Sequence, residues 1–255
     1  MLNSKTAFLI SLALISSVLI SSSPADLHWP TWRGPNMAGV SPDGNPPIRW
    51  SETENIKWSV QLTGDGSNSS PIVWGDRIFF QAAVKTEKEG PGGAEAAAGG
   101  GRRRGPGSQP PRNLYRFTMV CLDRTSGKTI WEKTVCQAQP HEGHHGDHGF
   151  VSFTPATDGK LLWGNYGSQG VYCFDLDGNL KWSRDLGKMR IRAGFGEGGS
   201  LALAGDLVIV LRDHEGDSFI VALKKDTGEV VWKKDRDEKT SWTTPLVVES
   251  GGRRQ

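Results

Sequence analysis

The densest group of side chains that could do chemistry is the histidine-rich run 141–148. It reads His-Glu-Gly-His-His-Gly-Asp-His and contains the spacing H-E-x-x-H, which binds zinc in metalloproteases when it lies on a helix. Pro140 precedes the run and glycines interrupt it, so we do not expect a helix or a protease. Two interpretations stay open: a loose transition-metal site, or a polar loop that leads into a strand. The candidate metal ligands are His141, His144, His145 and His148.

A second motif, at residues 194–199, reads Gly-Phe-Gly-Glu-Gly-Gly and matches the dinucleotide-binding pattern G-x-G-x-x-G. That pattern holds a pyrophosphate when it follows a strand and opens a helix. Here the strand-like residues Ser-Leu-Ala-Leu follow, so nucleotide binding is not expected. Arg190 and Arg192, just before the motif, are expected to form a solvated basic patch.

The elements that position these segments repeat along the chain. An apolar strand, a turn rich in Asp and Gly, and a second strand ending in Trp occur three times, with the pattern Gly-x-x-x-Trp. Asn55–Leu62 closely matches Asn179–Leu186, with Trp58 in the place of Trp182. The repeated residues are Gly127, Gly178, Gly228, Trp131, Trp182 and Trp232.

A second landmark precedes each copy: a Ser or Thr that opens an apolar strand, at Ser70, Thr154, Ser200 and Thr244. Each unit then has four short antiparallel strands in roughly 45–50 residues, which is typical of one β-propeller blade. The fold class is therefore all-β, a β-propeller of four-stranded antiparallel blades. A Trp at one fixed place in each blade is expected to be buried between neighbouring blades.

The chain holds about three blades by this count, fewer than the four to eight that close a ring. Asn55–Leu62 is expected to be the last strand of one blade, and Thr244–Val248 the first strand of another. The sequence therefore predicts an incomplete ring and a truncated product. Open blade edges are expected to pair with other chains, including further copies of this one.

The N-terminus has the pattern of a secretory signal. Lys5 is followed by an uncharged apolar run, and then by small residues that a signal peptidase could cleave. We expect residues 1–25 to be the signal peptide and residues 26–255 the partial propeller. The apolar run is too short for a comfortable membrane span, and no cysteine lies nearby to carry a lipid. The mature chain is expected in the periplasm or outside the cell, without a transmembrane helix.

Composition argues against two classes of protein, nucleic-acid binders and disulfide scaffolds. The net charge of +2 gives no reason to expect a nucleic-acid partner. Only three cysteines are present, Cys121, Cys136 and Cys173, so the chain is not a disulfide scaffold, and two of them are expected in strand cores. Residues 85–113 are rich in Gly, Ala and Arg without an apolar pattern, and we expect a disordered insertion there.

One family resemblance is specific. The run 222–232, Ala-Leu-Lys-Lys-Asp-Thr-Gly-Glu-Val-Val-Trp, resembles the Trp-containing repeats of PQQ-like (quinoprotein-type) β-propeller proteins. The opening Trp29–Pro35 is similar to the mature start of bacterial members without an assigned enzyme activity. The family includes periplasmic quinoprotein alcohol dehydrogenases and the propeller component of the outer-membrane-protein assembly machinery. This chain resembles the second kind more than the first.

The resemblance also guides the functional expectation. A PQQ-dependent dehydrogenase would need a vicinal cysteine pair, a calcium-binding Glu/Asn set and a catalytic Asp, but no two cysteines are adjacent here. No cofactor is therefore expected, and no catalytic residue is assigned. The leading hypothesis is a non-enzymatic exported scaffold that binds envelope proteins. The alternatives are a fragment of a PQQ-dependent oxidoreductase and a metal-binding envelope protein that uses the His141–His148 loop.

Overall fold

The computed structural model describes residues 28–41, 44–62, 64, 67–91 and 109–254. The expected signal peptide and the centre of the expected insertion lie outside these residues.

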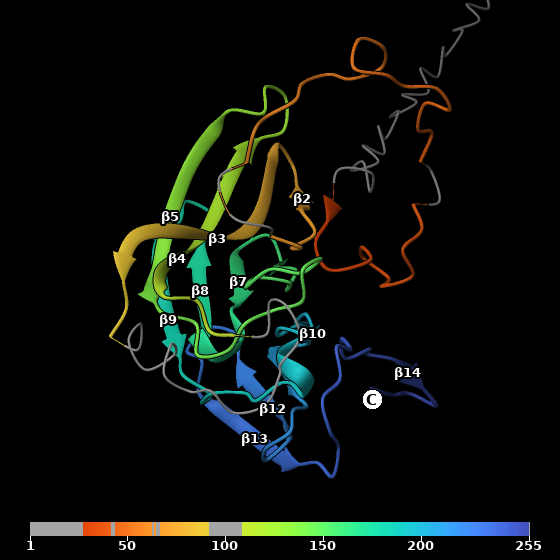
Figure 1. Ribbon diagram of the computed structural model, residues 1–255. Helices are drawn as coiled ribbons and strands as arrows, with labels where there is room; N and C mark the ends of the chain where they lie inside the picture. Colours follow the sequence, from red (N-terminus) through yellow and green to blue (C-terminus); the bar gives the residue numbers. More distant parts are fainter. Residues whose placement is uncertain (1–27, 42–43, 63, 65–66, 92–108, 255) are drawn as a thin grey trace, which may run out of the picture.

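The chain forms three antiparallel sheets that stack side by side, followed by a small hairpin (Figure 1). The first sheet has the order β1-β2-β3-β4-β5, with β1 His28–Trp29, β2 Ile72–Trp74, β3 Arg77–Glu89, β4 Asn113–Asp123 and β5 Thr129–Ala138. The second is β6 Ala156–Thr157, β7 Leu161–Asn165, β8 Val171–Asp175 and β9 Leu180–Arg184. The third is β10 Ala202–Ala204, β11 Leu207–Arg212, β12 Phe219–Lys224 and β13 Val230–Asp235. The hairpin is β14 Glu249–Ser250 and β15 Arg253–Arg254, and two short 3₁₀ turns are η2 Gly167–Gln169 and η3 Arg192–Gly194.

This arrangement confirms the predicted fold class: blade-like antiparallel sheets, about three in number, which do not close into a ring within the described residues. The first sheet has five strands instead of the predicted four. β1 adds to β2 through the pairs His28 with Trp74 and Trp29 with Val73, so the segment that opens with Trp29 joins the sheet.

The core lies between the sheets. Phe79, Met119 and Cys121 of the first sheet form one buried cluster with Leu162 and Phe174 of the second. Because side chains alternate along a strand, the second sheet has another face, and that face is buried against the third sheet. The second cluster includes Trp163, Val171, Cys173, Val208, Val221 and Leu223. Each sheet thus buries its apolar residues against a neighbouring sheet, as stacked repeats do.

The repeated Trp residues join consecutive sheets at their outer strands. The indole Nε1 of Trp131 donates to the Leu176 carbonyl at 3.1 Å, and that of Trp182 donates to the Lys225 carbonyl at 2.9 Å. Both carbonyls belong to the last turn of the following sheet. Trp58 makes the equivalent bond to Arg124 of the first sheet, at 2.9 Å.

The glycine of each turn faces the incoming indole. A Cβ atom at Gly127, Gly178 or Gly228 would approach a Trp ring atom to 2.6, 2.9 or 2.5 Å, closer than carbon atoms pack. All three glycines also have positive φ angles of 72°, 81° and 69°, which other residues adopt at a cost. The Gly-x-x-x-Trp pattern therefore has two roles: its glycine receives the Trp of the preceding unit, and its Trp contacts the turn of the next.

Trp232 corrects the expectation that all three repeat Trp side chains are buried. It is 41% exposed, whereas Trp182 is 8% exposed and Trp131 is partly buried. The reason is that no turn of a further sheet follows it among the described residues.

The two outermost predicted strands are also wrong. Residues 56–62 and 244–248 form no β-ladder in the structure, because neither segment has a neighbouring strand among the described residues. They cover sheet faces instead: Trp58 packs on the cluster of Phe80 and Leu122, and Val247 packs on the cluster of Ile209 and Ala222.

The limits of the insertion also differ from the predicted range 85–113. β3 continues to Glu89 and β4 begins at Asn113, with Lys85 opposite Tyr115 and Glu89 opposite Asn113. Residues 92–108 lie outside the described part of the chain, so the expected disorder there stays a prediction.

Cys121 and Cys173 are buried free thiols, as the sequence indicates. Burial raises the pKa of each thiol to about 12, so both are packing residues and not nucleophiles.

We predict that Trp182→Ala lowers the free energy of unfolding by about 3–5 kcal/mol, because it removes a buried indole and leaves a cavity. Trp232→Ala is the matched control, since the same repeat position is 41% exposed there, and we expect it to cost about 1–2 kcal/mol. Urea denaturation of both variants measures the two losses of unfolding free energy. Equal losses would contradict the packing described above.

Candidate functional site: the loop face

Long connections gather at one end of the second and third sheets. In an antiparallel four-stranded meander, the connection between the two middle strands and the exit from the last strand lie at the same end. Here these segments are residues 166–170 and 185–201 for the second sheet, and residues 213–218 and 236–244 for the third. Together with residues 139–155, which enter the second sheet, they form what we call the loop face.

The histidine run and the glycine-rich motif lie against each other on the loop face. The backbone N–H of His145 donates to the carbonyl of Phe195 at 3.1 Å. Gly196 is in contact with the histidines: a Cβ atom there would lie 2.8 Å from His148 Nδ1 and 3.0 Å from His144 Cβ. The two motifs are far apart in sequence but form one structural unit.

Trp242 completes this unit from the segment that follows β13. Its indole Nε1 donates to the Gly196 carbonyl at 2.8 Å, and its ring centroid lies 6.5 Å from that of Phe195. Neither aromatic residue stands out in the sequence as a candidate site residue. The repeat contains a signal for Trp242. It stands two residues before Thr244, and the residue at that offset in the second unit, Ser152 before Thr154, also lines the groove.

A groove of about 460 Å³ opens between these loops, and we call it the aromatic groove. Its aromatic side is formed by Phe195 and Trp242, each 44% exposed. It is lined by Asn68, His145, Asp147, His148, Ser152, Phe195, Gly198, Gly199 and Trp242.

The structure does not bring the four candidate histidine ligands to one point. His141 Nε2 donates to the Met189 carbonyl at 2.6 Å, and His144 Nδ1 donates to the His145 carbonyl at 2.7 Å. His148 Nδ1 bonds to Gly149 O at 3.1 Å. Within the described part of the chain, no group of three or more His, Cys, Asp or Glu side chains is placed to hold a metal ion.

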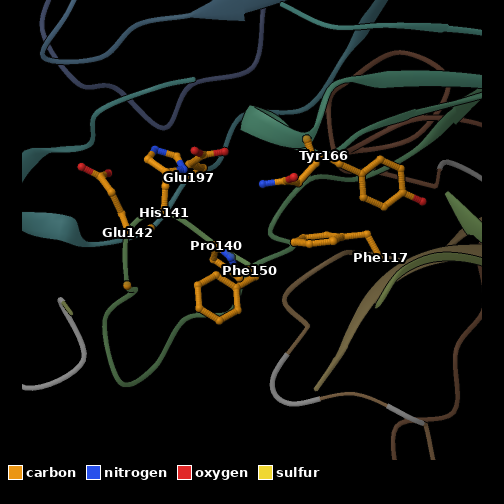
Figure 2. A pocket seen from close by; sticks show the side chains of 10 residues that line it. Phe117, Pro140, His141, Glu142, Phe150, Tyr166 and Glu197 are labelled. Carbon is orange, nitrogen blue, oxygen red and sulfur yellow. The ribbon is translucent and has the colours of Figure 1, made fainter. Parts of the chain in front are cut away.

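A second hollow on the loop face is a cavity of about 30 Å³ between the first and second sheets (Figure 2). Figure 2 shows His141, Glu142 and Glu197 on one side of the view, and the rings of Phe117 and Tyr166 on the other. The cavity has room for about one water molecule, so it is too small for an organic substrate.

The carboxylates beside this cavity hold loops together. Glu197 accepts a hydrogen bond from the backbone N–H of Ser168 at 2.6 Å and another from the Ser168 hydroxyl. Burial raises the pKa of Glu197, while the hydrogen bonds from Ser168 and the charge of Arg212 oppose that rise. Glu142 accepts from the backbone N–H of Ile191 at 2.8 Å.

Charged groups in and next to the third sheet also hold the loops together. The buried Arg212 donates to the carbonyl of Gly167 at 2.7 Å and to that of Gly187. Asp213 accepts from Arg236 Nε at 2.7 Å and from the Ser241 hydroxyl at 3.0 Å. The side-chain charges thus fix the backbone of the loop face.

Comparison with known proteins identifies the family. A family model described as outer membrane protein assembly factor BamB matches residues 115–251, which is more than half of the chain. The chain belongs to this family. The match begins in β4 and covers both later sheets, including the loops described above. No curated protein matches the chain.

Solved structures of similar fold include members of both branches named in the sequence analysis. The quinohemoprotein alcohol dehydrogenase from Comamonas testosteroni is 14% identical, with 82% of this chain and 27% of that chain covered and a TM-score of 0.46. BamB from Moraxella catarrhalis is 16% identical, with 49% and 36% covered and a TM-score of 0.32. The quinohemoprotein alcohol dehydrogenase ADHIIG from Pseudomonas putida HK5 is 13% identical, with 69% and 21% covered and a TM-score of 0.41. This chain therefore spans only part of the length of these proteins.

No helix in the described part of this family member has the length and apolar character needed to cross a membrane.

We predict that acidification destabilises the loop face through His148. Burial lowers its pKa below the ordinary 6.5, and the nearby His144 and His145 add to this. Because the folded state then binds fewer protons than the unfolded state, stability is full above the unfolded pKa and is lost as pH falls through it. His148→Gln should therefore reduce the loss of unfolding free energy between about pH 7.5 and about pH 5. Urea denaturation at the two pH values measures it, and an unchanged loss in the variant would contradict the assignment.

Proposed function

We propose that this chain is a non-enzymatic, exported β-propeller scaffold that binds protein partners in the cell envelope through its loop face. The family it belongs to is described as an outer membrane protein assembly factor, which supports an envelope role. The apolar N-terminal run that reads as a secretory signal supports export to the periplasm or beyond.

One observation carries the proposal: three carboxylates of the loop face are bound to neighbouring loops, while two of its aromatic side chains are exposed. Glu142, Glu197 and Asp213 each accept hydrogen bonds from neighbouring loop residues. Phe195 and Trp242 present their rings to solvent. A general acid or base must reach its substrate, whereas exposed aromatic anchors are typical of the centre of a protein interface.

The alternative of a PQQ-dependent oxidoreductase has less support from the residues of this chain. Its three cysteines lie in three different strands, β4, β5 and β8, so no vicinal cysteine pair is present. We therefore propose that the chain works without a bound cofactor. A metal-binding role of the His141–His148 loop also has less support, because no group of three or more possible ligands comes together there among the described residues. Open sheet edges such as that of β13 offer a further contact, with another copy of the chain.

The proposal predicts site-specific contact with a partner protein in the envelope. A photo-crosslinking phenylalanine analogue placed at Phe195 in the native host should give one discrete crosslinked protein, identified by mass spectrometry. The same analogue at Leu180 is the control, because that residue is at least as exposed, 55% against 44%, but lies on the outer strand of the second sheet, outside the loop face. We expect no discrete product there.

Two outcomes would contradict the proposal. One is the same pattern of products at both positions. The other is dye-linked alcohol oxidation by the purified chain after addition of PQQ and calcium, which would support the oxidoreductase alternative.

A further inference from the structure

The loops of the second and third sheets meet at one seam of the loop face. Residues 188–191 follow β9 of the second sheet, and residues 213–218 join β11 to β12 in the third. The backbone N–H of Glu215 donates to the Arg190 carbonyl at 2.7 Å, and the backbone N–H of Arg190 donates to His214 Nδ1 at 3.2 Å. The Arg190 guanidinium also donates to the Glu215 carbonyl. One of the bonds that close this seam therefore ends on a titratable ring.

His214 accepts a second hydrogen bond at the same nitrogen. The backbone N–H of Gly216 donates to Nδ1 at 3.1 Å. A Cβ atom at Gly216 would lie 2.6 Å from the ring Cε1, so a glycine lets the turn close around the imidazole. A ring nitrogen that accepts hydrogen bonds carries no proton, so the neutral ring is protonated on Nε2. An imidazolium has a proton on both nitrogens and can accept neither bond.

The surroundings of the ring oppose a positive charge. His214 is 7% exposed. Burial lowers the pKa of His214 below the ordinary 6.5, and the positive charges of Arg212 and, from the facing segment, Arg190 lower it further. A backbone hydrogen bond and the negative charge of Asp217 oppose this effect. Two further carboxylates of the turn are bound to the segment after β13: Asp213 to Arg236 and Glu215 to Thr240.

Other contacts hold residues 188–191 to the second sheet. The backbone N–H of Met189 donates to the Ser168 hydroxyl at 2.7 Å, and that of Ile191 donates to the Glu142 carboxylate at 2.8 Å. Neither contact is lost when an imidazole gains a proton. A groove of about 300 Å³ already lies at the seam and gives the two loops room to move apart.

We propose that His214 is an acid-sensitive latch: when its ring gains a proton, the backbone of Arg190 separates from residues 213–218, and the loops of the second and third sheets part at this seam. The segment that is released leads directly to Phe195, so the latch changes the loop face in mildly acidic surroundings. This inference goes beyond the proposed function, because the latch works whether or not the loop face binds a protein.

The sign of the effect follows from proton linkage. In the latched state His214 binds a proton less readily than in the open state, where its pKa is that of free histidine, about 6.5. The latched state is therefore fully favoured above that pKa and loses its advantage as pH falls through it. Between about pH 7.5 and about pH 5, the fraction of open molecules should rise by up to about thirtyfold.

Amide hydrogen exchange of the full chain, followed by NMR, measures the opening. We expect the protection factors of the Arg190 and Gly216 amides to fall by up to about thirtyfold between the two pH values, and those of the central amides of β11 to fall much less. In His214→Asn the fall should disappear, because the Asn side-chain oxygen lies near the place of Nδ1 and accepts the same bonds without titrating. His148→Gln is the control variant and should keep the fall.

A second measurement needs no variant. The ring nitrogen shifts of His214 at about pH 7.5 should show a proton on Nε2 and none on Nδ1. Three results would overturn the inference: a proton on Nδ1 at that pH, equal protection of the two amides at both pH values, or a fall that persists in folded His214→Asn. If His214→Asn does not fold, the native spectra decide, because the loss of protection must follow the titration of the His214 ring itself.

Discussion

The structure depends on one contact, the docking of a Trp indole onto the last turn of the following sheet. A single four-stranded sheet has two apolar faces and cannot bury both, so it needs a neighbour in a fixed position. The indole hydrogen bond fixes that position at the outer strands, and the turn glycine makes room for the ring. Since the glycine also has a positive φ angle, the turn and the Trp constrain each other.

The inner strands are joined by a second, smaller contact. The backbone N–H of Thr154 donates to Ser200 Oγ at 2.9 Å, and that of Ser200 donates to Thr244 Oγ1 at 3.0 Å. These are the residues that open each repeat. With the Trp182 contact at the outer strands and the Thr154–Ser200 contact at the inner strands, the second and third sheets are held at two places. The loop face therefore sits on a rigid base, which keeps the two rings of the aromatic groove in place.

The repeated units could be predicted from sequence because each carries its own signals: an apolar strand, an Asp/Gly turn and a Trp at a fixed offset. The segments at the two ends of the array could not be predicted correctly. Strand formation at Asn55–Leu62 and Thr244–Val248 depends on a partner strand and not on the segment alone. The same holds for Trp232, whose burial depends on a turn that a neighbouring sheet must supply.

The candidate site was less predictable than the fold. The sequence drew attention to the run 141–148 and to the motif 194–199, but as separate candidates for metal and nucleotide binding. Both are loops that enter an inner strand of neighbouring sheets, and only the stacking of those sheets brings Gly196 against His148. Trp242 joins them from a third loop for the same reason. Contacts of this kind are set by the repeat geometry, and no local pattern encodes them.

The docking of Trp182 onto Gly228 can be tested directly by adding one methyl group. Gly228→Ala places an alanine at a positive φ angle and also displaces the indole, and both changes destabilise the fold. Gly75→Ala has only the first of these effects. Gly75 has a φ of 57° and nothing within 4 Å of an added Cβ atom. In urea denaturation we expect Gly75→Ala to lower the free energy of unfolding by about 1–2 kcal/mol, and Gly228→Ala by about 1–3 kcal/mol more than that. Equal losses in the two variants would show that the Trp contact does not hold the sheets together.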